Sequence, residues 1–240
     1  NSTPFVTEKH LYFTSHDGAL YALDKINGQL IWKFVTEGEK KKDLWDYFLS
    51  SPVVRKNEVF FGSGDGRLYA LDRIQGKKLW SFPTGGIVHA TPVVDSGNVY
   101  FGSYDGWFYA LNRQDGSIHW KFNTVGQRWF PRGAVQRGAA LASNTLYFGS
   151  RDFNIYALHA ETGTGMWNMY EQGSWVIATP VVKDTLLLFG TSDSHHFYAL
   201  DNRYGNTMWK TQLNLNVFGG AATRDQQVYF GCLNGKVYAL

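Results

Sequence analysis

Short apolar segments of four to six residues alternate with polar turns along the whole chain. In the clearest copy, Val59–Gly62 is followed by the turn Ser63–Gly66 and then by the second apolar segment Leu68–Leu71. Segments rich in Val, Tyr, Phe and Leu favour β-strands, and Asp-Gly supplies the positive φ that a tight hairpin needs. No window shows the sustained 3.6-residue period of an amphipathic helix. The pattern therefore predicts consecutive antiparallel hairpins.

The hairpins belong to a longer phrase that recurs along the chain. A Tyr-Ala-Leu segment is followed by Gly seven residues after its Tyr, and by Trp four residues after that Gly, in five complete copies. Successive Tyr residues are 48, 40, 47, 42 and 40 positions apart, and a sixth copy stops at Leu240. A period near 40 with fixed internal spacing is the signature of a repeat architecture.

Each repeat contains four predicted strands, and four-stranded antiparallel units repeated about six times are typical of a β-propeller. We therefore predict an all-β propeller of six blades, with the last blade incomplete. The chain is expected to be one domain spanning residues 1–240, with repeats at about 2–34, 51–82, 91–122, 138–169, 179–211 and 220–240. The recurring tryptophans are expected to pack between blades: Trp32, Trp80, Trp120, Trp167 and Trp209.

Composition narrows the class of protein further. Aromatic residues make up 17% of the 240 residues and there are 26 glycines, which suits short strands joined by tight turns. The net charge of +3 gives no reason to expect a nucleic-acid partner. The single Cys232 excludes an internal disulfide and a cysteine-rich metal site, and we expect a small buried side chain there. No signal peptide or membrane-spanning run is present, so the protein is either cytosolic or has lost a leader.

The phrase from Ala22 through Gly28 to Trp32 resembles the tryptophan-docking motif of the quinoprotein dehydrogenase-like (PQQ-like repeat) propellers. The same motif recurs in the other four complete copies, so the resemblance covers essentially the whole chain. It implies that each Trp packs between the Ala of its own repeat and the Gly peptide of a neighbouring repeat. The family includes alcohol dehydrogenases that depend on pyrroloquinoline quinone (PQQ) and a non-catalytic, BamB-like branch.

The candidate site lies where the sequence departs from its repeat. In a propeller, the links between blades and the turns between second and third strands emerge on one face. Two links are longer than the others, between Trp32 and Pro52 and between Trp120 and Ala139. Aromatic rings beside Arg and His suit sugars, peptides or carboxylates, although the aromatic residues of the links could instead cap the blade ends. The candidate ligand- or partner-binding residues are Trp45, Tyr47, Phe48, His89, Arg128, Trp129, Phe130, Arg132, Arg137, Arg151, Trp175 and Phe218.

A catalytic role is not expected from these residues. The PQQ-dependent branch implies adjacent cysteines and a set of carboxylate and amide ligands for Ca²⁺, whereas this chain has one Cys and an aromatic, basic rim. His195 and His196, read as strand neighbours, would point to opposite faces, so we predict no metal site. We expect no catalytic residue and no cofactor, with PQQ and Ca²⁺ as the alternative.

The resemblance thus favours a binding scaffold in the periplasm or another extracytoplasmic part of the cell envelope. It would act either like the BamB-like outer-membrane assembly factors or as the propeller module of a larger envelope or sensor protein. The expected partner is a protein or peptide, or alternatively a glycan, held on the face that carries the long links. Attachment to a membrane would need a segment outside this sequence. The alternatives to the scaffold are a PQQ-dependent dehydrogenase and a carbohydrate-binding propeller.

Overall fold

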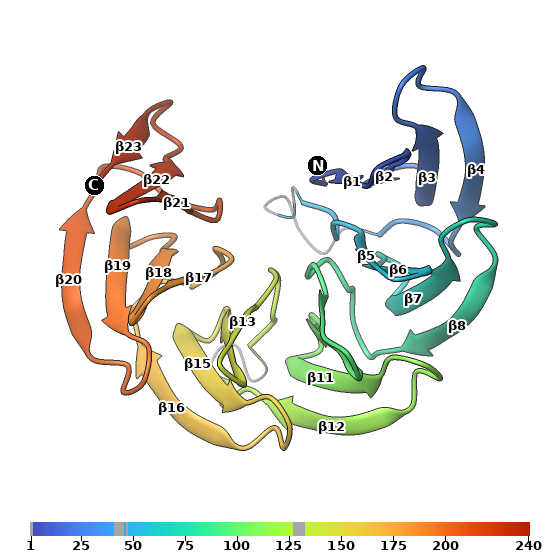
Figure 1. The fold of residues 1–240 in the computed structure, drawn as a ribbon. Helices are drawn as coiled ribbons and strands as arrows, with labels where there is room; N and C mark the ends of the chain where they lie inside the picture. Colours follow the sequence, from blue (N-terminus) through green and yellow to red (C-terminus); the bar gives the residue numbers. More distant parts are fainter. Residues whose placement is uncertain (1, 41–45, 47, 127–132) are drawn as a thin grey trace. The chain divides into compact units, whose positions relative to one another are not determined.

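The computed structural model describes residues 2–40, 46, 48–126 and 133–240. Within these residues there is no helix, and the strands form six antiparallel sheets, five with four strands and the last with three (Figure 1). Each sheet is a meander in which consecutive strands are neighbours. These sheets confirm the predicted all-β fold with an incomplete last blade.

The chain divides into two compact units, residues 1–121 (unit 1) and 122–240 (unit 2), and the boundary falls inside one strand, β12. The first three sheets contain β1 (Phe5–Val6), β2 (His10–Ser15), β3 (Ala19–Asp24), β4 (Leu30–Val35), β5 (Val53–Arg55), β6 (Glu58–Gly62), β7 (Arg67–Asp72), β8 (Lys78–Pro83), β9 (Val93–Val94), β10 (Asn98–Gly102), β11 (Trp107–Asn112) and β12 (Ile118–Asn123). The prediction of a single domain stays a prediction.

The strands of unit 2 repeat the same order. They are β13 (Ala140–Ala142), β14 (Thr145–Gly149), β15 (Asn154–His159), β16 (Gly165–Tyr170), β17 (Val181–Lys183), β18 (Leu186–Gly190), β19 (His196–Asp201), β20 (Thr207–Gln212), β21 (Ala222–Arg224), β22 (Gln227–Gly231) and β23 (Val237–Ala239). No helix among the described residues is long and apolar enough to cross a membrane.

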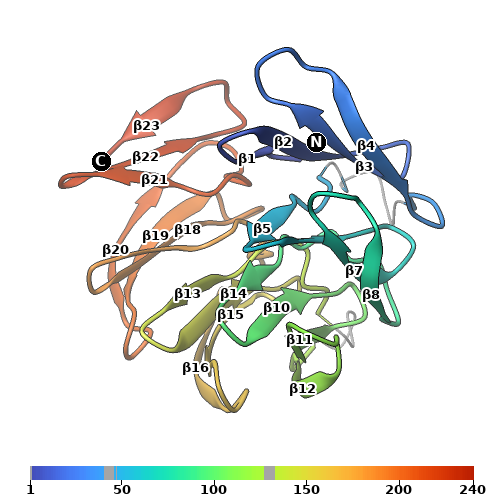
Figure 2. The same cartoon turned by 45° about the vertical axis from the view of Figure 1, so that its right-hand side comes forward.

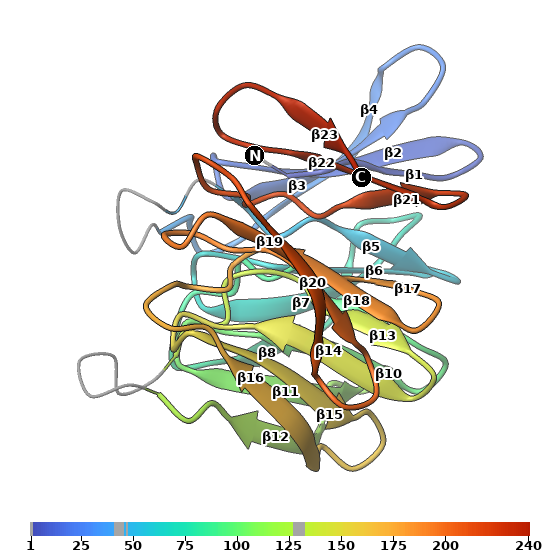
Figure 3. The ribbon, with the colours of Figure 1, turned by 90° about the vertical axis from the view of Figure 1, so that its left-hand side faces the viewer.

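The apolar core lies between successive sheets. In unit 1, the sheets β1–β4 and β5–β8 are neighbours (Figure 2), and Tyr12 and Leu20 of the first pack with Phe61 and Leu71 of the second. In unit 2, the sheets β13–β16 and β17–β20 are neighbours (Figure 3), and a similar cluster lies between them. Because one sheet cannot bury both of its faces alone, stacking on its neighbours supplies most of its apolar burial.

The tryptophans mark the contacts between sheets. Trp32 stands opposite Ala22 of its own sheet, and a β-bulge follows that pair. Its indole Nε1 donates to the carbonyl of Arg73 in the next repeat, at 3.0 Å. A Cβ atom on Gly76 would lie 2.6 Å from the Trp32 ring, so the ring rests directly on that peptide. Trp80 on Gly116 and Trp167 on Gly205 repeat the arrangement.

The five rings are half-buried rather than fully buried, as the outermost strands of their sheets leave one side in solvent. The apolar stabilisation per Trp is therefore smaller than that of a fully buried indole. The Nε1 hydrogen bond and the contact with glycine fix where each indole lies on the neighbouring sheet. Glycine is needed at the docking position because even a Cβ atom there would occupy the space of the ring.

Glycine at the end of three second strands, at Gly62, Gly149 and Gly190, admits the link that follows the sheet. A Cβ atom on Gly62 would lie 2.2 Å from the carbonyl oxygen of Val88, and one on Gly149 would lie 2.1 Å from that of Val176. Neither glycine has a positive φ, so the requirement is for space and not for backbone freedom. These contacts hold the links over the hairpin turns and so position the candidate site.

Candidate binding surface on the links and turns

In each unit the links run over the turns between second and third strands, as the propeller topology predicted. In unit 1, the Val88 amide donates to the carbonyl of Ser63 at 3.1 Å, and the Tyr104 amide donates to that of Ile87 at 2.9 Å. In unit 2, the Val176 amide donates to the carbonyl of Ser150 at 3.2 Å, and the Ser192 amide donates to that of Trp175 at 3.1 Å. We call these links, together with the turns they cover, the link–turn surface.

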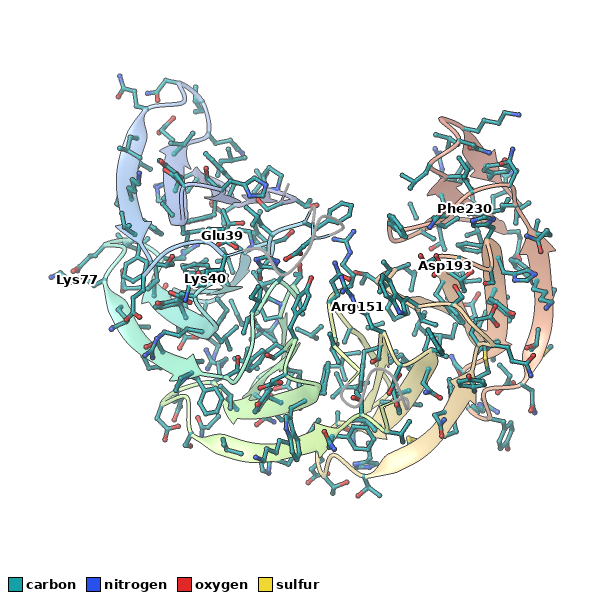
Figure 4. All side chains as sticks on the ribbon, turned by 180° about the vertical axis from the view of Figure 1, so that it is seen from behind. Glu39, Lys40, Lys77, Arg151, Asp193 and Phe230 are labelled. Carbon is teal, nitrogen blue, oxygen red and sulfur yellow. The ribbon has the colours of Figure 1, made fainter. Side chains whose placement is uncertain are left out.

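A buried ionic cluster occupies the link–turn surface of unit 1. His89 Nδ1 lies 2.8 Å from Asp46 Oδ1, and His89 Nε2 forms a short contact with Glu39 Oε1. Tyr104 donates its hydroxyl to Asp46 at 2.8 Å, and the Gly64 amide donates to Glu39 at 3.2 Å. In Figure 4 Glu39 lies among the side chains of unit 1, whereas Lys77 projects into solvent.

The cluster holds His89 in its charged form at neutral pH. Its side chain is 1% exposed, and burial by itself would lower the pKa of the imidazole. Hydrogen bonds to Asp46 and Glu39, with the negative charge of both carboxylates, outweigh that effect and raise the pKa of His89 to about 8. The imidazolium therefore ties the first link to the second link and the third turn.

A second cluster occupies the link–turn surface of unit 2. Arg151 donates from Nε to Gln136 Oε1 at 3.0 Å, and its guanidinium lies 4.6 Å from the centre of the Trp175 ring. Arg151 and Gln136 are 6% and 2% exposed, while Trp175 is half-buried. Stacking on the ring and bonding to the amide fix the guanidinium between two links.

The remaining described candidates have different surroundings. Arg137 is half-buried, and its Nη2 donates to the carbonyl of Phe218 at 3.1 Å. Phe218 is 8% exposed, and Phe48 is half-buried. The structure thus brings Arg137 to Phe218 and Arg151 to Trp175 in unit 2, and places His89 in the cluster of unit 1.

Six candidates lie outside the described residues: Trp45, Tyr47, Arg128, Trp129, Phe130 and Arg132. Their predicted role in binding stays a prediction. Cys232 is buried as expected, and its thiol donates to the carbonyl of Leu215 at 3.2 Å.

Sequence reasoning did not identify the acidic partners of His89 or the amide partner of Arg151. Glu39 and Asp46 lie in the long first link, and no local motif joins them to His89. It located His195 and His196 at the extra residue of the fifth turn, but the argument that they are neighbours on a strand does not apply to His195. His195 lies in the turn with φ 55°, and β19 begins at His196.

The repeated four-stranded sheets with docked tryptophans define the class of PQQ-like β-propellers. Comparison with known families agrees: the family described as outer membrane protein assembly factor BamB matches residues 1–106, 42–168 and 105–240. The chain belongs to this family. No curated protein matches the sequence.

Solved structures support the same fold at low sequence identity. BamB from Moraxella catarrhalis is 20% identical with a TM-score of 0.78, over 99% of this chain and 68% of that one. The computationally designed protein Ika8 is 16% identical with a TM-score of 0.79, over 99% and 70%. Quinohemoprotein alcohol dehydrogenase ADHIIG from Pseudomonas putida HK5 is 21% identical with a TM-score of 0.71, over 88% of this chain and 42% of that one.

The dehydrogenase relative raises the question of whether a quinone and Ca²⁺ fit here. Calcium takes about six to eight oxygen ligands. On the link–turn surface of unit 1 the described carboxylates brought together are Glu39 and Asp46, and both are turned onto His89. Across the described ranges no group of three or more His, Cys, Asp or Glu has the arrangement of a metal site. The carboxylates of this cluster therefore do not offer Ca²⁺ the oxygen ligands that it needs.

Proposed function

We propose that this chain is a non-catalytic scaffold of the cell envelope that takes part in outer-membrane protein assembly by holding a protein or peptide partner. The family match supports this role, because it spans the chain and its description names an assembly factor. The periplasm is the compartment that such a role requires.

The observation that carries the proposal is how the charged residues of the link–turn surface are used. His89 is held by two carboxylates, and Arg151 is held by an amide and an indole. These contacts connect links to turns and make the surface rigid. A rigid surface binds a partner with a smaller loss of conformational entropy than a loose one.

Trp175 and Arg137 are the described residues best suited to contact the partner. Both are half-buried on this surface. Tryptophan and arginine are also the side chains that most often dominate the energy of protein interfaces. Their aromatic and guanidinium groups would contact the partner while the buried clusters beneath hold them in place.

Site-specific photo-crosslinking in the envelope of a Gram-negative host tests this role. A photoreactive residue at Trp175 should crosslink to an outer-membrane assembly protein, and Arg137→Ala should reduce the yield about tenfold. Tyr204 is the control site, because it is 71% exposed but lies in a turn outside the link–turn surface. Equal crosslinking from Tyr204, or an undiminished yield with Arg137→Ala, would refute the proposal.

A further inference from the structure

A carboxylate–tyrosine pair recurs in the first four sheets. The third-strand Tyr donates its hydroxyl to the Asp four residues earlier, in the turn of the same repeat. The four pairs are Tyr21–Asp17 (2.5 Å), Tyr69–Asp65 (2.6 Å), Tyr109–Asp105 (2.7 Å) and Tyr156–Asp152 (2.5 Å). Three of these carboxylates also accept an amide of the preceding link, at Glu37, Gly85 and Gly126.

In the first repeat this pair also neutralises a lysine. Lys33 lies one residue after the docking Trp, 2.9 Å from Asp17 and 4.8 Å from the centre of the Tyr21 ring. The hydrogen bond from Tyr21 and the bond from Lys33 lower the pKa of Asp17 to about 2. The Lys33 ammonium, the Tyr21 side chain and the Asp17 carboxylate thus all interact with one another, and the charge of the lysine is neutralised.

The fifth repeat keeps the tyrosine and the lysine but moves the carboxylate. Its turn has one extra residue, and Asp193 (labelled in Figure 4) is exposed and does not bond to Tyr198. Tyr198 donates instead to Glu171, at 2.6 Å. Glu171 belongs to the preceding link and is also 3.4 Å from His196 Nδ1.

Glu171 stands where three other links have threonine, at Thr36, Thr84 and Thr124. Two departures from the repeat, the longer turn and the Thr-to-Glu change, therefore occur together and compensate for each other. The buried Glu171 is bonded to Tyr198 and paired with His196. Lys210, the counterpart of Lys33, lies 5.5 Å from the centre of the Tyr198 ring and has no carboxylate partner within the described residues.

A pocket of about 570 Å³ opens at this position. One wall is formed by residues 169–172, including the 48%-exposed Tyr170, and the other by Ser194, His196 and Lys210 of the fifth repeat. Tyr170 packs edge-on against Phe153, whose backbone is held at φ 70° in the left-handed region. Strained backbone in a non-glycine residue is commoner at functional sites than elsewhere.

We propose that this pocket binds a ligand with a single carboxylate beside an apolar or aromatic group. Because the Tyr198 hydroxyl is already bonded to Glu171, the ligand carboxylate pairs with Lys210 alone, beside the Tyr198 ring. Met169 and Tyr170 contact the apolar part. Glu171, which also lines the pocket, repels additional negative charge, so a monoanion is favoured over a phosphate dianion. The inference compares repeats 1 and 5 and is independent of the scaffold proposal.

Chemical-shift titration of the isotopically labelled protein tests the site. The probes are N-acetylphenylalanine, its uncharged amide, phenyl phosphate and the peptide N-acetyl-Phe-Asp-amide. The free acid or the peptide should shift the His196 and Lys210 side-chain signals in a saturable way, and the other two probes should not. Comparison of the acid with the peptide distinguishes a small-molecule carboxylate from an acidic side chain in a partner chain.

Lys210→Met should weaken binding about tenfold or more, as removal of one partner of a charged hydrogen bond does. Lys33→Met is the matched control, because it removes the same side chain from repeat 1, where Asp17 already neutralises it. Lys210 is exposed, so the melting temperature should change little. Equal binding of the amide, or an unchanged affinity in Lys210→Met, would overturn the inference.

Discussion

His89 is a buried cation whose charge depends on two carboxylates. Its pKa in the folded protein is raised to about 8 from the ordinary value of 6.5. A raised folded-state pKa adds stability that is complete below pH 6.5 and is lost as the pH rises through 8. Because one pKa unit is worth about 1.4 kcal/mol, the loss is on the order of 2 kcal/mol.

We therefore expect the free energy of unfolding, measured in urea from about pH 6 to about pH 9, to fall by that order of magnitude. His89→Gln should be less stable at low pH and should have a flatter pH dependence. His119→Gln is the control, since His119 is exposed and bonds to Asn98. If the free energy of unfolding of His89→Gln falls with pH as steeply as that of the wild type, groups other than His89 cause the dependence and the prediction is wrong.

The sequence predicted His89 as a candidate residue but not the ionic cluster that contains it. Its partners Asp46 and Glu39 are 43 and 50 residues away. No periodicity in the sequence encodes a contact between two irregular links. Glu171 could have been recognised, because a carboxylate replaces threonine in the link just before the one turn with an extra residue.

At the scale of strands and turns, two effects on stability can be measured separately: the docking of Trp32 on Gly76, and the backbone strain of the turn that contains this glycine. Gly28 and Gly76 occupy the same turn position with φ of 72° and 68°. A Cβ atom meets nothing within 4 Å at Gly28 but lies 2.6 Å from the Trp32 ring at Gly76. Alanine at either position costs about 1 kcal/mol in backbone strain, and overpacking adds roughly 1–3 kcal/mol at Gly76 alone.

Gly76→Ala should therefore lower the free energy of unfolding clearly more than Gly28→Ala, as measured by guanidinium denaturation. The indole fluorescence of Gly76→Ala should also change, because the Trp32 ring must move. If the two variants lose the same stability, the docking contact contributes little and the strain of the turn accounts for both losses.

The regular elements were the most predictable part of the molecule. Strands and turns follow from alternation and from Asp-Gly or Asn-Gly pairs, and the register follows from the fixed distance between Tyr and Trp. The left-handed backbone of Phe153 was not predicted, because a bulky side chain rarely adopts that conformation, and there the surrounding structure overrides local preference. His195 adopts the same conformation, in which histidine is commoner than most residues, and it was not predicted either.

At the scale of the whole molecule, the repeat fixed the class of fold but did not separate a scaffold from a quinoprotein dehydrogenase. A BamB and a quinohemoprotein alcohol dehydrogenase both match this chain in fold, so the fold alone does not decide between the two. Because Ca²⁺ needs about six to eight oxygen ligands, the oxygens that the links of this chain bring together bear on the question. Here Glu39 and Asp46 are bonded to His89, and the chain has a single cysteine.

We expect incubation of the full chain with PQQ and CaCl₂, followed by desalting, to leave no quinone absorbance with the protein and no dye-linked alcohol oxidation. The physical reason is that Ca²⁺ would have to displace the imidazolium from two buried carboxylates and would still lack most of its six to eight oxygen ligands. An apo quinoprotein alcohol dehydrogenase treated in parallel supplies the positive control. Retention of one quinone per chain would mean that residues outside the described ranges complete a cofactor site, and the scaffold proposal would then fail.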